Sequence, residues 1–326
     1  MKKQLMSLVA VCVVLMALLA IVLFTLLNPF DLKEIESIEE FEGSGTAASS
    51  SREEVNLEAH LSEVDTENDN VVITWDDDYW YFTSNSLPDH ETGAFPNSSN
   101  PNTISEIDAE YRVSRDPRME KNFTEVKIPG ITLGGVSFDP GTAEKDEVTG
   151  WSIEAIQDFL DLGLDFNNAH VQPSGKYHYH GVPESLVEGD SPGEHSSLVG
   201  FAADGFPVYA RYGFDQDGAV IEHEASWQLK TGEREDGPTG EYDGTYTLDY
   251  EYIENAGSLD ECNGVYTVTP EYPDGTYVYF LTDTFPFIPR CVYGEPDDSF
   301  TQQNDGPLET ARGSDDLPPP GAPPRP

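Results

Sequence analysis

A succession of short segments rich in β-branched and aromatic residues constrains the fold of this chain more than any other feature. Each is bordered by Gly, Pro, Asn or Asp, residues that end strands and form turns. The segments are VVITW (71–75), YWYFT (79–83), EYRVS (110–114), TEVKIP (124–129), GVSFD (135–139), FPVYARYGF (206–214), TYTLDYEYI (245–253), GVYTVT (264–269) and GTYVYFLTD (275–283). This pattern predicts a mainly β domain over residues 71–294, an antiparallel β-sandwich or a barrel-like sheet. No internal repeat is evident.

One segment has a helical pattern instead. The stretch GWSIEAIQDFLDLG carries apolar residues at helical spacing, and Gly163 follows them as a stop signal. We therefore expect one helix at about residues 151–162, with an apolar face formed by Trp151, Ile153, Ile156, Phe159 and Leu160.

The N-terminal segment pairs Lys2 and Lys3 with an apolar run from Leu5 to Leu27. The run is long enough to cross a bilayer as a helix, and it exceeds the usual apolar core of a signal peptide. Residues 1–30 are therefore expected to form a transmembrane helix that contacts the membrane through residues 5–27, with a cleaved signal as the alternative. The basic flank predicts a single-pass protein whose C-terminal domain lies outside the cytoplasm.

The segments that flank the β domain have no pattern of a folded unit. Residues 31–70 are acidic and rich in Ser and Thr, which predicts a flexible stalk, and residues 295–326 form a Pro-rich tail that we expect to be disordered.

The chain is strongly acidic. With 61 acidic and 17 basic residues, its formal net charge of −44 argues against nucleic acid or an anionic lipid surface as a partner. A solvated surface adapted to salty water explains this acidity more simply than an acidic binding site does.

Three cysteines occur, and Cys12 lies within the apolar run. The other two, Cys262 and Cys291, would lie on the oxidising side of the membrane, which favours a disulfide between them. A pair of cysteine metal ligands is the rival interpretation, although their separation resembles no compact zinc knuckle.

The stretch NNAHVQPSGKYHYHG (167–181) holds three of the seven histidines. Its Gln-Pro-Ser-Gly sequence predicts a turn between two short strands. Because side chains alternate along a strand, His178 and His180 point one way, while Tyr177 and Tyr179 point the other. With Pro173-Ser174-Gly175 as the loop, His170 lies opposite His178 and all three imidazoles share one face. A loop one residue longer or shorter would send His170 to the other face.

Three imidazoles on one face can bind a transition metal and leave a coordination position for water. Zn or Cu is the expected divalent ion, although imidazole also binds iron and nickel. The alternative is a polar sheet face whose histidines only make hydrogen bonds. The chain contains no Gly-x-Ser-x-Gly elbow, Walker loop or dinucleotide-binding fingerprint, which argues against a serine hydrolase, an NTPase and a Rossmann oxidoreductase.

The sequence YHYHG resembles the signature of the YHYH-domain family. Further blocks resemble that family in its order: SNSLPDHETGAFPNSSNPNTI from Ser84, GVSFDPGTAE from Gly135, LGLDFNNAHVQPSGKYHYHGVP, LVGFAADGFPVYARYG and LDECNGVYTVTPEYPDGTYVYFLTDTFPFIPRC. The resemblance covers residues 71–294. It implies an extracytoplasmic domain and carries no particular activity with it.

These blocks also contain further candidate site residues. His90 and His195 lie in polar loops and are candidates to complete a metal shell. Glu144 and Asp204 are candidate bases, or hydrogen-bond partners of a ligand histidine. His60 and His223 lie outside the blocks and are expected at the surface.

Three functions remain open. The first is a membrane-tethered metal-binding domain, and the second is a metal-dependent hydrolase that uses the same site. The third is a cell-surface interaction module that exposes aromatic residues such as Trp75, Trp80 and Tyr81.

Overall fold

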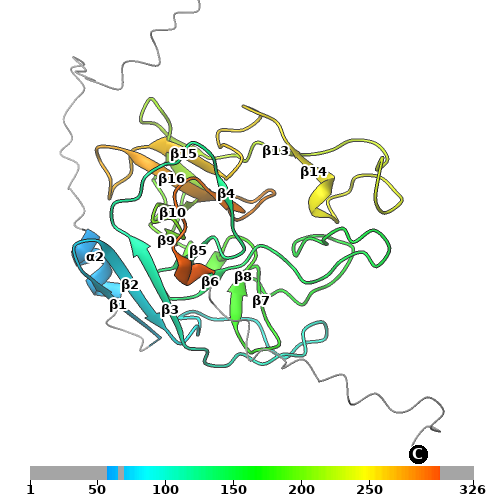
Figure 1. Ribbon diagram of the computed structural model, residues 1–326, viewed down its shortest axis with the longest axis horizontal. Coiled ribbons are helices and arrows are strands. Elements are labelled where there is room, and N and C mark those ends of the chain that lie inside the picture. The colour runs from blue at the N-terminus through cyan, green and yellow to red at the C-terminus, as the bar shows by residue number, and fades with distance from the viewer. Residues whose placement is uncertain (1–56, 65–69, 302–326) are drawn as a thin grey trace, which may run out of the picture. The chain divides into compact units, whose positions relative to one another are not determined.

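The structure is a computed structural model that describes residues 57–64 and 70–301. The largest element is an eight-stranded sheet in the order β15-β16-β10-β9-β5-β6-β8-β7, whose labels follow one another down the centre of Figure 1. Its strands are β5 (Gly130–Thr132), β6 (Ser137–Phe138), β7 (Ala169–Val171), β8 (Tyr177–Tyr179), β9 (Gly200–Ala202), β10 (Pro207–Ala210), β15 (Gly264–Thr267) and β16 (Thr276–Leu281). Two of the pairings, β6 with β8 and β10 with β16, are parallel, so the sheet is mixed.

A second, antiparallel sheet contains β1 (Val71–Trp75), β2 (Tyr79–Ser84) and β3 (Ala109–Ser114). Short ribbons complete the fold: β11 (Tyr212–Phe214) with β12 (Val220–Glu222), β13 (Trp227–Leu229) with β14 (Tyr250–Tyr252), and β4 (Thr124–Glu125) with β17 (Cys291–Val292). The prediction of a mainly β domain is confirmed. No closed barrel forms among the residues that the structure describes.

The eight-stranded sheet consists of two halves with the same connections. The first half contains strands β5, β6, β8 and β7, and the second half contains β9, β10, β16 and β15. Counted outward from the centre of the sheet, the strands of the two halves therefore follow the same order. The halves meet at the antiparallel pair β5–β9, where Ile131 pairs with Phe201, Gly130 with Ala202 and Thr132 with Gly200. Because directly opposed residues in an antiparallel pair are related by a local twofold axis, this pairing places a pseudo-twofold axis between the halves.

The hydrogen bonds of the two halves correspond in detail. Asp165 begins the first hairpin and Asp260 the second, and each carboxylate accepts backbone hydrogen bonds from the residues two and four positions later. Each also accepts a tyrosine hydroxyl hydrogen bond, from Tyr177 and Tyr277 respectively. The two halves thus correspond in their connections and hydrogen bonds, although the sequence has no repeat at a fixed period.

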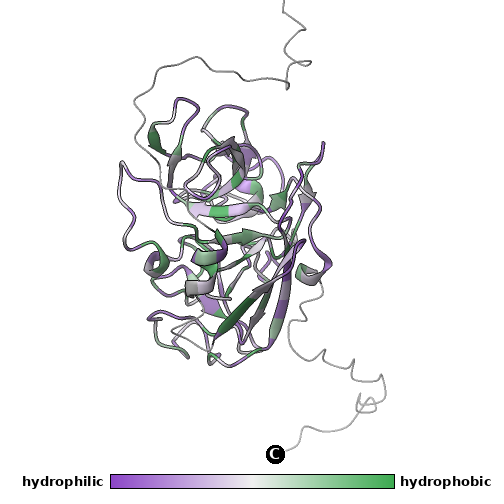
Figure 2. Ribbon diagram, turned by 90° about the vertical axis from the view of Figure 1, so that its left-hand side faces the viewer, coloured by the Kyte–Doolittle hydropathy of each residue, from purple (hydrophilic) through white to green (hydrophobic). Residues whose placement is uncertain are grey.

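Two apolar cores fill the fold, and Figure 2 shows the hydrophobic residues concentrated on the strands. One core joins the three-stranded sheet to the eight-stranded sheet and includes Trp80, Phe82, Phe201 and Phe280. The other core contains Tyr177 and Tyr179 of β8 together with their counterparts on β16, Tyr277 and Tyr279. Each half therefore directs its paired tyrosines into one shared core.

The helix expected at residues 151–162 is absent. Ser152 and Ile153 instead form isolated bridges to Lys145 and Tyr246, which require an extended backbone. The side chain of Gln157 accepts a hydrogen bond from the backbone N–H of Leu160, a donor that a helix would have used. Phe159 is 69% exposed, so the apolar spacing does not correspond to a buried face here.

Two stretches outside the expected domain are structured. The helix α2 (Leu57–Val64) lies within the predicted stalk, and Leu61 is buried in the core beside the three-stranded sheet. At the other end, the 3₁₀ turn η3 (Asp298–Phe300) lies within the predicted tail, and Phe300 packs against Tyr111. The 3₁₀ turns η1 (Glu184–Leu186) and η2 (Thr247–Asp249) lie in loops of the domain.

The predicted anchor, residues 1–30, lies outside the described residues. Among residues 57–64 and 70–301, no helix has the length and apolar character needed to cross a membrane.

Candidate metal centre

The β7–β8 hairpin brings three histidines together as its register predicts. Gln172 and Gly175 close the turn by a backbone hydrogen bond of 2.8 Å, and the positive φ of Gly175 permits it. The strands then pair His170 with His178, and Val171 with Tyr177. The prediction that His170, His178 and His180 share one face is confirmed.

The three imidazoles form a nearly equilateral triangle. Their ring centroids lie 4.8 Å apart for His170 and His178, 4.6 Å for His170 and His180, and 4.7 Å for His178 and His180. One nitrogen from each ring lies within 4.8 Å of the other two. Tetrahedral zinc needs nitrogens about 3.3 Å apart, so metal binding would draw the rings together by up to about 1.5 Å. These residues could hold a metal after small side-chain movements.

Backbone carbonyls orient two of the rings. Nδ1–H of His170 donates to the Leu162 carbonyl at 3.0 Å, and Nδ1–H of His178 donates to the Lys176 carbonyl at 3.3 Å. A carbonyl can only accept, so both rings keep the lone pair on Nε2, as metal-ligating histidines commonly do. Neither ring nitrogen of His180 meets hydrogen-bond geometry with a described residue, but the backbone of Pro140 is close enough to act on its pKa, in the raising direction.

Burial keeps the imidazoles neutral. Desolvation is the main cause that lowers the pKa of His170, and it holds the pKa values of His178 and His180 well below the usual range. Repulsion from the neighbouring rings adds to the effect for His178 and His180. Neutral imidazole is the form that binds a metal, so the centre is in its ligand form at neutral pH.

Two polar residues of this region are not among the predicted site residues. Asp139 follows β6 and is only 4% exposed, and its Oδ2 accepts a hydrogen bond from the Gln172 amide at 3.1 Å. Asp139 lies in the same block, GVSFDPGTAE, as the predicted Glu144, so part of the signal is present in the sequence. The parallel pairing of β6 with β8 brings Asp139 beside the histidine strand, and the sequence did not reveal this pairing.

The structure does not bring His90 or His195 to the centre. Nε2 of His90 lies 2.6 Å from the Tyr179 hydroxyl, which is on the opposite face of β8 from His178 and His180. His195 packs against Tyr209 and Phe214 in the second half. Neither belongs to the group of histidines that could share a metal ion.

The two candidate acids differ in position. The Glu144 carboxylate is half-buried and close enough to His170 to raise the pKa of that imidazole. Asp204 instead lies in the β9–β10 turn, where it accepts hydrogen bonds from the Tyr279 hydroxyl at 2.7 Å and from backbone N–H groups of Gly294 and Phe206. Desolvation raises the pKa of Asp204 to about 6. Its contacts show a buried structural group of the second half.

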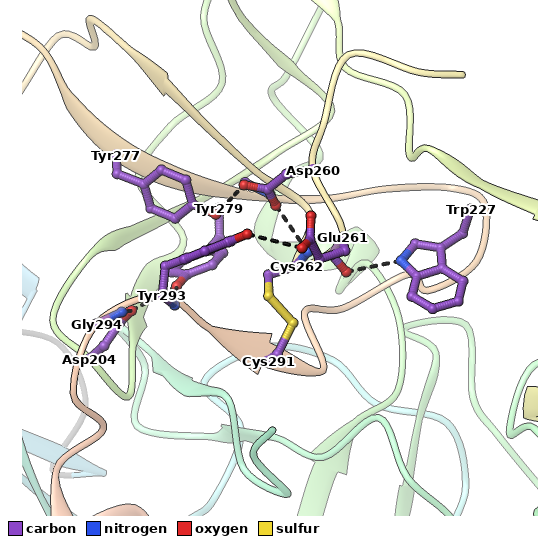
Figure 3. Close-up of a disulfide and its surroundings, with 11 residues drawn as sticks. Asp204, Trp227, Asp260, Glu261, Cys262, Tyr277, Tyr279, Cys291, Tyr293 and Gly294 are labelled. Atoms are coloured by element: carbon purple, nitrogen blue, oxygen red, sulfur yellow. Dashed lines mark hydrogen bonds between the residues drawn. A yellow bond between two sulfur atoms is a disulfide. The ribbon is translucent and has the colours of Figure 1, made fainter. Parts of the chain in front are cut away.

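A disulfide joins Cys262 and Cys291, as predicted. Figure 3 shows Tyr277, Tyr279 and Tyr293 around it, each with a carboxylate partner. The disulfide therefore joins β17 to the start of the second hairpin, and neither cysteine belongs to the group of residues that could share a metal ion.

One further expectation is corrected. His223 is 4% exposed and stacks on Phe280, with ring centroids 4.1 Å apart, so it is a core residue and not a surface one. The interaction module depended on an exposed aromatic row, and Trp80 does not contribute to one because it is 3% exposed and belongs to the core, whereas Trp75 is 38% exposed.

Comparison with known families agrees with this arrangement. The family model described as YHYH protein matches residues 110–294, more than half of the chain. The chain belongs to the YHYH family. Searches of curated proteins and of solved structures find no match. The matched region of the YHYH protein begins in β3, ends just after β17, and includes the whole eight-stranded sheet.

Proposed function

We propose that this YHYH protein is a membrane-anchored, extracytoplasmic protein that binds a divalent transition metal through His170, His178 and His180. The anchor is the apolar run at residues 5–27, and the strongly acidic domain would then avoid nucleic acid and anionic lipid surfaces. The observation that carries the proposal is the buried triangle of neutral imidazoles, two of them oriented by backbone carbonyls.

The second half of the sheet supports a ligand role for these histidines. The two hairpins can be aligned on one residue pair, because Ala169 pairs with Tyr179 in the first and Gly264 pairs with Tyr279 in the second. In this alignment Val265 is equivalent to His170, Val278 to His178 and Phe280 to His180. Val278 and Phe280 are fully buried in an apolar core. The scaffold therefore folds without histidines at these positions, so their presence in the first half calls for a separate explanation.

Zn and Cu are the proposed ions. Three neutral imidazoles suit both, and among the described residues the ligand group contains no cysteine thiolate, a ligand that would favour Cu(I).

Metal content tests the proposal. The full chain is purified with detergent at high salt, without a histidine tag, beside the triple variant His170→Val/His178→Val/His180→Phe. Elemental mass spectrometry should give close to one metal ion per wild-type chain and almost none in the variant. Equal metal content in the two proteins, or a folded wild type that takes up no metal, would refute it.

A metal-dependent hydrolase is the second candidate. A cavity of about 510 Å³ has both apolar and acidic lining residues, among them Leu162, Asp158 and Asp243. None of the three histidines lines it, but the Leu162 carbonyl is the hydrogen-bond partner of His170. A metal at the centre would lower the pKa of a bound water to about 7. Glu144 is the candidate base because it lies near His170, whereas Asp204 is fully engaged in the second half. Metal-dependent ester or phosphoester hydrolysis that is lost in Glu144→Gln would support this activity, and wild-type protein that is metal-loaded yet inactive on both substrate classes would oppose it.

A further inference from the structure

The histidine face contains more buried polar groups than three metal ligands require. Besides the ring nitrogen of His180 that a metal would take, Ser137 Oγ and Gln172 Oε1 are buried and make no hydrogen bond within the described residues. Each such group costs roughly 1–3 kcal/mol when it is left without a partner. Two such groups on the histidine face indicate a bound polar ligand.

These groups lie on one face of the sheet. Phe138 pairs with Tyr179 in the parallel pair β6–β8, so the side chains on either side of Phe138, Ser137 and Asp139, point to the same face as His178 and His180. The hydrogen bond from Gln172 to Asp139 joins β7 to the end of β6 on this face.

The second half provides an independent check on this placement. Val208 pairs with Tyr279 in the second half, just as Phe138 pairs with Tyr179 in the first. The residues that follow are therefore equivalent as well, so Tyr209 corresponds to Asp139 and Phe280 to His180. The rings of Tyr209 and Phe280 lie 6.1 Å apart. The equivalent positions in the first half therefore bring Asp139 beside His180.

At the positions equivalent to the histidine face, the second half pairs its polar groups. Its counterparts of Ser137 and Gln172 are Pro207 and Thr267, and the Thr267 hydroxyl donates to the Phe214 carbonyl at 2.8 Å. The Tyr209 hydroxyl reaches Thr269 and Glu271, at 2.9 and 2.7 Å. Elsewhere in the second half Asn263 Oδ1 and His223 Nε2 lack a partner among the described residues, so the comparison holds for these equivalent positions and not for the half as a whole.

We propose that the metal carries one exchangeable oxygen ligand, and that Asp139, Gln172 and Ser137 form the subsite that holds it. This inference rests on the proposed metal-binding function. Gln172 Oε1 and the Asp139 carboxylate only accept hydrogen bonds, and the Ser137 hydroxyl can accept one. These three side chains therefore favour an oxygen ligand that donates hydrogen bonds, such as water or an alcohol, over an anion. The positive charges of Lys176 and Arg290, which reach His178 and His180 respectively, act in the opposite sense.

Azide binding to the full-length protein loaded with Co²⁺ tests this subsite, because the visible spectrum of Co²⁺ responds to an exchanged ligand. Wild type should bind azide weakly. Asp139→Asn removes a buried negative charge beside the open position and should tighten azide binding about tenfold or more. Gln172→Glu adds a negative charge there and should weaken it. Asp204→Asn is the control, since it alters a buried carboxylate that is engaged in the second half and should change the affinity less than about threefold.

Each of the following outcomes would overturn the inference. A Co²⁺ spectrum that azide leaves unchanged in wild type and in Asp139→Asn would show a closed coordination shell. Equal azide affinity in wild type and Asp139→Asn, or a larger effect in Asp204→Asn, would remove Asp139 from the open position. Tighter azide binding in Gln172→Glu would contradict the acceptor-rich subsite, even if Asp139→Asn failed to fold. A wild type that takes up no Co²⁺ would refute the proposed function, and this inference with it.

Discussion

His180 on the first hairpin and Phe280 on the second occupy equivalent positions of the eight-stranded sheet. Each donates its backbone N–H to the carbonyl of an asparagine with positive φ, His180 to Asn168 at 2.8 Å and Phe280 to Asn263 at 2.9 Å. One scaffold thus presents a buried imidazole in one half and a buried phenyl ring in the other. The fold tolerates either, so the imidazole is better explained by ligand binding than by packing.

The first prediction concerns exchange of the histidines for their counterparts. His170→Val/His178→Val/His180→Phe should fold and should raise the free energy of unfolding of the metal-free protein by about 1–3 kcal/mol, because it removes buried polar nitrogens that lack partners. Urea unfolding of both metal-free proteins at high salt measures this difference. A loss of several kcal/mol, or failure to fold, would mean that the histidines hold the hairpin together.

The second prediction concerns pH. Burial, with a smaller contribution from His195, lowers the pKa of His223 to about 4. The unfolded chain therefore binds a proton at this residue below pH 6.5, whereas the folded protein does not, so stability is lost as pH falls. Between about pH 7 and about pH 5, wild type should lose about 2 kcal/mol more than His223→Gln, which cannot become charged.

Unfolding free energies of the metal-free proteins at the two pH values provide the check. The histidines of the centre are present in both proteins, so their contribution cancels in the comparison. Parallel pH dependences in wild type and His223→Gln would show that His223 titrates normally.

The third prediction separates Asp204 from the metal centre. Asp204→Ala leaves the Tyr279 hydroxyl and two backbone N–H groups without their acceptor, and should lower the free energy of unfolding by about 2–4 kcal/mol. The folded variant should retain its full metal content by elemental mass spectrometry. Loss of the metal from a folded variant would return Asp204 to the list of site residues.

The fourth prediction concerns the disulfide, whose cysteines are 29 residues apart. Cys262→Ala/Cys291→Ala should lower the free energy of unfolding by about 3–4 kcal/mol in the chain-entropy account. The comparison uses urea unfolding of the oxidised wild type and the double variant. Metal content should be equal in the two, because the disulfide lies in the second half; a coupled loss of metal would contradict the separation of the two sites.

The sequence alone predicted the features that depend on local chemistry. The strands, the turn at Gln172-Pro173-Ser174-Gly175 and the common face of three histidines follow from alternation and turn residues. The helix at residues 151–162 was wrong because tertiary bridges to Lys145 and Tyr246 override an apolar periodicity. Such long-range pairings cannot be predicted from the spacing of apolar residues within one segment.

The same limit hid the correspondence of the two halves and the position of Asp139. Asp165 and Asp260, like Tyr177 and Tyr277, play matching roles, but unequal loops separate the elements of the two halves, so no fixed period appears. Asp139 reaches the histidine strand only through the parallel pairing of β6 with β8, which joins segments about forty residues apart. His90 and His195 were chosen for their loops, and the sequence could not show that they lie away from the centre.

X-ray absorption at the edge of the metal found in the purified protein tests the central claim most directly. The account predicts three imidazole nitrogens at about 2.0–2.1 Å, with their characteristic outer-ring scattering, and one further light-atom ligand. The imidazole scattering should disappear in His170→Val/His178→Val/His180→Phe. A first shell without imidazole in the wild type, or one that survives in this variant, would place the metal elsewhere and contradict the account.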